Sequence, residues 1–150
     1  MYRRRAYDLL TRVRDEFDAG QFALRRVLSE WDHDADLVIA AQQGYVTETE
    51  IRRCADNLEL TFVLRLFSEF EAILRDFWTQ GMGRATEPTM TQLLDSIAAR
   101  CAVHPDDLAM AHNIREFRNQ IIHESLRELR FDYPRCARAL GKYLSRLPVD

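Results

Sequence analysis

The sequence predicts an all-α protein, an antiparallel helical bundle of about five helices with one long central helix. Three observations lead to this class. Glycine and proline are scarce, with five and four copies in 150 residues, no stretch shows the strict alternation typical of strands, and apolar residues recur mostly at helical spacing. The length suits one domain, residues 1–150, with its own core. The 47% hydrophobic and 30% charged content is that of a folded globular chain.

The first third of the chain predicts one or two helices and a turn. Residues 4–31 carry apolar side chains at mostly helical spacing. Gly20 either divides this stretch into two helices or is tolerated inside a single long one. The segment DHDAD at 32–36 indicates a turn, and a short apolar piece, LVIAA, follows it.

The central helix is predicted to run from about 48 to 80. Thr47 lies three residues before Glu50, which is the capping-box pattern of a helix start. Residues 62–78 are apolar around most of the helix circumference, as expected for a helix covered on several sides. Its aromatic residues are expected to lie in the core or in a dimer interface. They are Phe62, Phe67, Phe70, Phe77 and Trp78.

Three segments complete the predicted bundle. A loop at 81–88 precedes a shorter helix at roughly 89–101. The next helix should run from about 105 to 125, because Pro105 stands at a first-turn position with two aspartates beside it. The segment FDYP repeats this start signal, with Asp132 near the cap of the last helix.

The charge balance narrows the classes of partner. A net charge of -3 argues against binding nucleic acid through bulk positive charge, and no DNA partner is expected. Residues 101–150 are nevertheless mildly basic, with 8 Lys/Arg against 7 Asp/Glu. All but one of the chain's basic residues are arginine, either through genomic base composition or because arginine binds phosphate in a fork geometry.

Cysteine usage and hydropathy indicate a cytoplasmic protein. The three cysteines, Cys54, Cys101 and Cys136, are widely spaced and include no CxxC pair. They are expected to be small buried residues of a reducing compartment. Because no segment approaches the length of a membrane span or shows the pattern of a signal peptide, no membrane association is expected.

The helix at 105–125 carries the strongest candidates for chemistry. On a helical wheel its core stripe contains Met110, Ile114, Phe117 and Ile121. A roughly opposite sector contains His112, Arg115, Asn119 and His123. Arg118 lies at the edge of the core stripe, about 140° from His123 on an ideal helix. Arg118 therefore either turns toward His123 or bridges to a carboxylate on another helix.

These residue types together are sufficient for metal-free RNA cleavage. A histidine accepts and donates protons near neutral pH. A guanidinium binds phosphate and stabilises the charge that grows in the transition state, and an amide can orient the imidazole or a ribose hydroxyl. The four histidines show no metal-ligand spacing such as HExxH. No metal and no cofactor is therefore expected, with the 2′-hydroxyl of the RNA as the nucleophile.

The segment RNQIIH at 118–123 resembles the R-x4-6-H signature of HEPN domains. The resemblance extends to the order and length of the helices over most of residues 45–147. It implies a homodimer whose motif helices line one cleft, and a metal-independent endoribonuclease acting on RNA. In this role His123 would be the general acid or base, Arg118 would bind phosphate and the transition state, and Asn119 would be the orienting group.

The resemblance also suggests supporting residues. Glu71 stands where several HEPN families keep an acidic residue facing the motif helix, and would fix Arg118 or His123. Glu69 competes for this role. Arg115 would be a second phosphate contact. Ser125 occupies the place of the tyrosine that is adenylylated in some HEPN toxins, so control by adenylylation gains no support.

Two classes of function follow from the resemblance. The first is a ribonuclease that serves as a toxin or phage-defence effector, with an antitoxin or other protein partner. The alternative is a non-catalytic HEPN-like module that binds a nucleotide, RNA or a protein. A helical dimerisation protein with a coincidental motif is the third reading.

Overall fold

The computed structural model describes residues 2–123 and 130–149. Within these ranges the chain is all-helical, with no strand, which confirms the predicted fold class. The helices are α1 (Tyr2–Glu30), α2 (Ala35–Gln43), α3 (Glu48–Asp76), the π-helical turn η1 (Phe77–Gly81), α4 (Met90–Cys101), α5 (Pro105–His123) and α6 (Tyr133–Leu144). No helix in the described part of the chain is long and apolar enough to cross a membrane.

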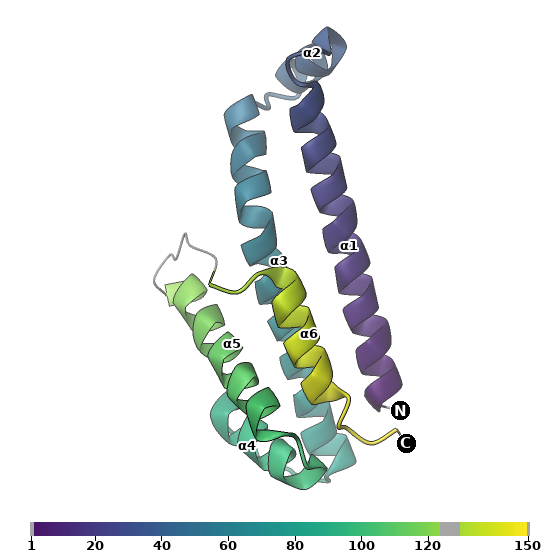
Figure 1. The fold of residues 1–150 in the computed structure, drawn as a ribbon, viewed down its shortest axis with the longest axis vertical. Helices are drawn as coiled ribbons and strands as arrows, with labels where there is room; N and C mark the ends of the chain where they lie inside the picture. The colour runs from purple at the N-terminus through teal and green to yellow at the C-terminus, as the bar shows by residue number, and fades with distance from the viewer. Residues whose placement is uncertain (1, 124–129, 150) are drawn as a thin grey trace.

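Helix α3 is the centre of the bundle, as predicted. It forms a long antiparallel hairpin with α1, and α2 lies at the tip of this hairpin (Figure 1). Helices α4, α5 and α6 pack around the C-terminal half of α3. Seven residues of α3 are buried: Leu60, Val63, Leu66, Phe67, Phe70, Ile73 and Leu74. The hairpin tip extends beyond the main core, and α2 contributes no buried residue.

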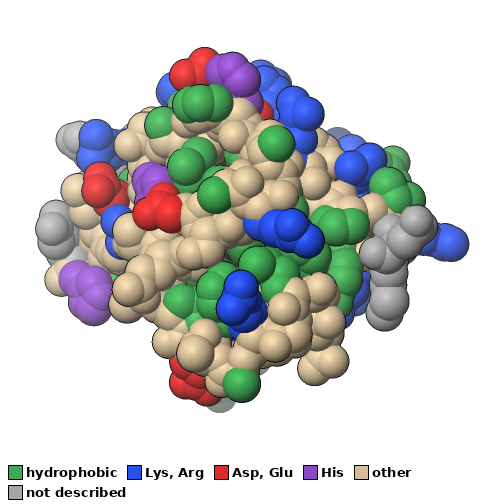
Figure 2. Space-filling model, turned by 90° about the horizontal axis from the view of Figure 1, so that it is seen from below, with side chains coloured by type: hydrophobic (Ala, Val, Ile, Leu, Met, Phe, Trp, Pro, Cys, Tyr) green, Lys and Arg blue, Asp and Glu red, His purple; other side chains and the backbone are tan. Residues whose placement is uncertain are grey.

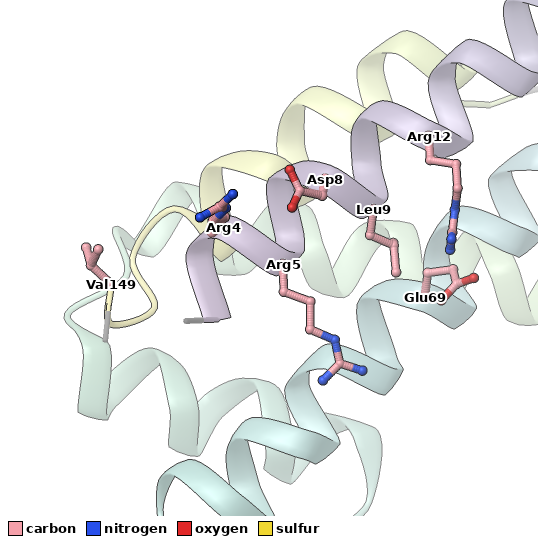
Figure 3. A pocket seen from close by; sticks show the side chains of 7 residues that line it. All are labelled: Arg4, Arg5, Asp8, Leu9, Arg12, Glu69 and Val149. Carbon is pink, nitrogen blue, oxygen red and sulfur yellow. The ribbon is translucent and has the colours of Figure 1, made fainter.

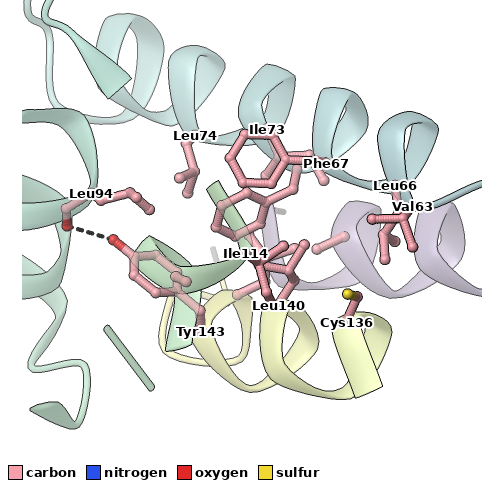
Figure 4. Packing of buried hydrophobic residues seen from close by; sticks show 14 of the residues in the cluster. Val63, Leu66, Phe67, Ile73, Leu74, Leu94, Ile114, Cys136, Leu140 and Tyr143 are labelled. Carbon is pink, nitrogen blue, oxygen red and sulfur yellow. Dashed lines mark hydrogen bonds between the residues drawn. The ribbon is translucent and has the colours of Figure 1, made fainter. Parts of the chain in front are cut away.

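The core joins α3 to α4, α5 and α6 (Figure 4). The buried Tyr143 of α6 packs its ring edge-on against Phe70 of α3, with centroids 5.5 Å apart. Its hydroxyl donates a 2.6 Å hydrogen bond to the backbone oxygen of Leu94 in α4. A single side chain therefore connects three helices, and its polar end is satisfied inside an apolar cluster.

Helix starts follow the predicted caps. Thr47 and Glu50 form the complete capping box at the start of α3, and Asp132 accepts a hydrogen bond from the backbone of Arg135 at the start of α6. Gly20 lies inside the continuous helix α1, which resolves the alternative left open above. The piece after the predicted turn is a separate helix, α2, because Asp34 caps it.

The central helix ends differently from the prediction. Its α-helical part stops at Asp76, and the chain continues as the π-turn η1, closed by a 2.9 Å bond from the Met82 N–H to the Phe77 carbonyl. Gly81 permits this turn, because a Cβ at this position would lie 2.4 Å from Cδ2 of the Phe77 ring. The prediction of three buried cysteines is correct for Cys136 alone, since Cys101 is half-buried and Cys54 lies on an uncovered face of α3.

Candidate functional site on helix α5

Helix α5 is anchored along one face. It begins at Pro105, with Asp106 and Asp107 in the first turn. Their negative charges interact favourably with the positive end of the helix dipole. Ala111, Ile114 and Phe117 are buried. The ring of Phe117 contacts Phe131 edge-on, with centroids 5.5 Å apart. The motif residues that follow Phe117 therefore sit on a fixed helix.

The predicted polar sector of α5 divides between a half-buried flank and an exposed end. His112, Arg115 and Asn119 are half-buried, whereas His123 is exposed. The flank is covered because α4 packs beside it, and His112 Nε2 lies 2.8 Å from Asp95 Oδ1 of α4. The sector is thus not opposite the core along its whole length, and His112 connects two helices.

Arg118 turns toward Asn119. Its Nη1 donates a 2.9 Å hydrogen bond to Asn119 Oδ1, and its Cζ lies 5.8 Å from the ring centroid of Phe67 on α3. Neither expected alternative, contact with His123 or a bridge to a carboxylate, is present among the described residues. A neutral amide holds the guanidinium instead, and the ring supports it through a cation–π contact.

The neutral partner has a chemical consequence for Arg118. A carboxylate partner would cancel the positive charge, but an amide oxygen fixes the orientation and leaves the charge for another anion. Only one of the five N–H donors of the guanidinium is used in the Asn119 bond. Arg118 is therefore oriented and half-buried, and keeps donors for a phosphate group.

His123 is the last described residue of α5 and is exposed. It follows Asn119 by four residues, or about 6 Å along the helix axis. Among the described residues it makes no hydrogen bond. Ser125, two residues beyond it, lies outside the described residues.

Glu71 does not contact the motif residues. Its Oε1 accepts a 2.8 Å hydrogen bond from Nε of Arg75, one turn along α3, because an i,i+4 partner is reached without crossing to another helix. Arg75 also donates to the Pro88 carbonyl at 3.3 Å. The competing carboxylate, Glu69, lines a hollow shared with α1 (Figure 3). The two predicted acidic candidates thus have other neighbours.

Arg115 lies on the flank of α5, one turn before Asn119. Its Nη2 is 3.8 Å from Glu116 Oε1, and its buried Nε has no hydrogen-bond partner among the described residues. Arg130 approaches the same helix from the chain before α6 and donates a 3.2 Å bond to Gln120 Oε1. Sequence reasoning missed Arg130 and also Phe67 beneath Arg118, since neither shares a helical spacing with the motif.

Two further observations concern the site as a whole. Among the described residues, no group of three or more His, Cys, Asp or Glu side chains is placed to hold a metal ion. Comparisons with protein-family models, with curated proteins and with solved structures give no significant match to the chain. The functional assignment therefore depends on the α5 residues themselves.

Proposed function

We propose that the chain is a metal-independent endoribonuclease of the HEPN type, acting on RNA through Arg118, Asn119 and His123. The observation that carries the proposal is the Arg118–Asn119 pair, which orients a guanidinium without neutralising it. The exposed His123 follows one helical turn later on the same helix. This combination suits a reaction in which a phosphodiester is bound and a proton is then transferred.

The reaction needs one base and one acid. A histidine removes the proton of the RNA 2′-hydroxyl, and the 2′-oxygen attacks the adjacent phosphorus. The bond to the 5′-oxygen breaks, and a second acid protonates this oxygen. The products are a 2′,3′-cyclic phosphate and a 5′-hydroxyl. In a two-chain cleft the two copies of His123 supply both roles, Arg118 binds the phosphoryl oxygens, and Asn119 positions Arg118.

A second copy of the chain is part of the proposal. Ile122, beside His123, is 48% exposed and places an apolar side chain next to the motif. Packing of two α5 ends around Ile122 would cover it and bring the two histidines to one cleft. Ile122→Asp should therefore shift the protein toward a monomer in light scattering and lower cleavage together with dimer content.

The test is RNA cleavage by the purified chain in EDTA. We expect His123→Ala and Arg118→Ala to lower the cleavage rate by about 10²- to 10⁴-fold, as for loss of a general acid–base or a transition-state contact. Asn119→Asp should also lower the rate, because a carboxylate would neutralise Arg118. His33→Ala and Arg53→Ala are matched controls, since both side chains are exposed and lie outside α5. A substrate with a 2′-deoxy sugar at the cut site should resist cleavage.

Cleavage that persists in His123→Ala at the wild-type rate, or an inactive wild-type chain, would reject the enzyme. Growth arrest on expression, relieved by the same variants, would support the role of toxin or phage-defence effector. A non-catalytic HEPN-like binding module is the second candidate. The separation of Arg118, which contacts Asn119 and Phe67, from the solvent-facing His123 favours it. RNA binding without cleavage, weakened by Arg118→Ala, would select this candidate.

A further inference from the structure

A hollow of about 550 Å³ lies at the end of the bundle that contains both chain termini (Figure 1). Four arginines from four separate segments line it: Arg3, Arg84, Arg100 and Arg146. No Asp or Glu is among its lining residues. Viewed from this end, the molecule shows Lys and Arg side chains beside an apolar patch in the middle of the face (Figure 2). The hollow thus combines four arginines with apolar lining residues, among them Phe77, Met82 and Leu147.

Among the described residues, none of the four guanidinium groups of this arginine hollow forms an ion pair. The larger hollow beside α1 differs, because Asp8 and Glu69 line it together with its arginines (Figure 3). There, Arg5 bonds Asp76 at 2.6 Å. In an acidic protein, four unpaired arginines around one concavity attract an anion.

The arginine hollow is also preorganised. Arg3 donates from Nε and Nη2 to the Leu147 carbonyl at 3.2 and 3.0 Å, a neutral partner that orients the fork and leaves its charge free. The π-turn η1 brings Met82 and Arg84 to the rim, through the bond from Met82 N to the Phe77 carbonyl. π-Turns of this kind are frequent at functional sites.

We propose that this hollow binds a phosphorylated small molecule. The arginine forks would hold the phosphate oxygens, and Met82, Leu147 and Pro148 would contact the organic part. The volume lies within the range of small-molecule sites. Arg118 lies 13 residues beyond the start of α5, or about 20 Å along the helix from the end of the bundle that holds the hollow. The proposed binding is therefore separate from the ribonuclease and stands whether or not RNA is cut.

The probes are ADP, inorganic pyrophosphate, inorganic phosphate and adenosine, titrated calorimetrically into the full chain at fixed salt. We expect ADP to bind more tightly than pyrophosphate and pyrophosphate more tightly than phosphate, and adenosine not to bind. The double variant Arg84→Gln/Arg100→Gln should weaken ADP binding by about 10- to 100-fold, because each guanidinium contributes charge-assisted hydrogen bonds. Arg53→Gln is the control: it removes one positive charge from an exposed part of α3 and should leave ADP binding unchanged.

Arg100 lies in the last turn of α4, where its positive charge also stabilises the helix by interacting with the helix dipole. A second readout on the wild-type chain therefore avoids effects of the variants on folding. ADP should slow alkylation of Cys101, which lines the hollow, and leave the exposed Cys54 unchanged. The proposal is overturned if neither ADP nor pyrophosphate binds, if Arg53→Gln weakens binding as much as the double variant, or if a 5′-hydroxyl RNA oligomer binds the hollow more tightly than ADP.

Discussion

Single arginines in this protein differ in the partner that holds them. Arg118 is held by an amide and Arg3 by a backbone carbonyl, both neutral acceptors. Arg65 instead pairs with Glu16, and this hydrogen bond lowers the pKa of Glu16 and raises that of Arg65. Exposed pairs of the second kind contribute little to stability. Arg118 and Arg3 are therefore oriented and still charged, and they belong to the two sites proposed here.

Two buried tyrosines allow a matched test of residue-scale energetics. Tyr143 donates a hydrogen bond to Leu94, whereas the buried hydroxyl of Tyr133 has no partner among the described residues. Tyr143→Phe should lower the free energy of unfolding by about 1–2 kcal/mol, and Tyr133→Phe should leave it unchanged or raise it slightly. Urea unfolding followed by circular dichroism measures both. Equal losses of unfolding free energy in the two variants would contradict the difference in hydrogen bonding between the two hydroxyls.

At the scale of helices, the starts of α3 and α6 were predictable, whereas the end of α3 was not. A start depends on a few neighbouring residues, such as the Thr47 side chain and the Glu50 that reciprocates it. The end of α3 depends on the buried Phe77 ring, which occupies the space beside Gly81. That contact also involves Tyr2 from the start of the chain, whose ring centroid lies 5.2 Å from that of Phe77. No local pattern contains it.

Two glycines in helices should respond in opposite directions to alanine. Gly81→Ala should destabilise the protein by about 1–3 kcal/mol, because its Cβ would overlap the buried Phe77 ring at 2.4 Å. Gly20→Ala should stabilise it by up to about 1 kcal/mol, because the nearest atom is 3.5 Å away and alanine favours a helix interior. Thermal unfolding of both variants tests the pair, and a destabilised Gly20→Ala would show that α1 is under closer packing than described.

The candidate sites show the same limit on prediction from sequence. The helix that begins at Pro105 and its buried stripe with Ile114 and Phe117 were predictable, since spacing along one helix determines which residues share a face. The direction of Arg118 was not readable, because Phe67 on another helix supports its guanidinium. No sequence pattern predicted the arginine hollow. Its four arginines come from the first helix, the loop after η1, the end of α4 and the chain after α6.

For the whole molecule, net charge is a poor guide to anion binding. The chain carries -3 overall, yet one end of the bundle presents a hollow whose charged lining residues are four arginines. Acidic residues gather instead around the hairpin tip, where Asp32, Asp34, Asp36, Glu48 and Glu50 lie before or near the starts of α2 and α3. The net charge therefore disfavours nucleic-acid binding by the molecule as a whole but not by its arginine-rich surfaces.

Stability of the whole fold should fall at alkaline pH. Burial raises the pKa of the Cys136 thiol from 9.0 to about 12 and that of Tyr133 from 10.0 to about 12, and it also raises the pKa of Tyr143. The unfolded chain releases these protons at a lower pH than the folded chain. The contribution of these groups to the free energy of unfolding is therefore fully present below about pH 9. It declines by about 1.4 kcal/mol per pH unit for each group as the pH rises toward 12.

The urea midpoint measured from about pH 7 to pH 11 tests this decline, and Tyr133→Phe identifies its source. The variant lacks one of the groups whose pKa is raised by burial. Its stability should therefore fall less steeply than that of the wild type above about pH 10. Below pH 9 the two proteins should show the same pH dependence, because the tyrosine is protonated in both states. A midpoint that stays constant up to pH 11 would mean that these groups titrate without unfolding, and hence that the core around α6 admits water.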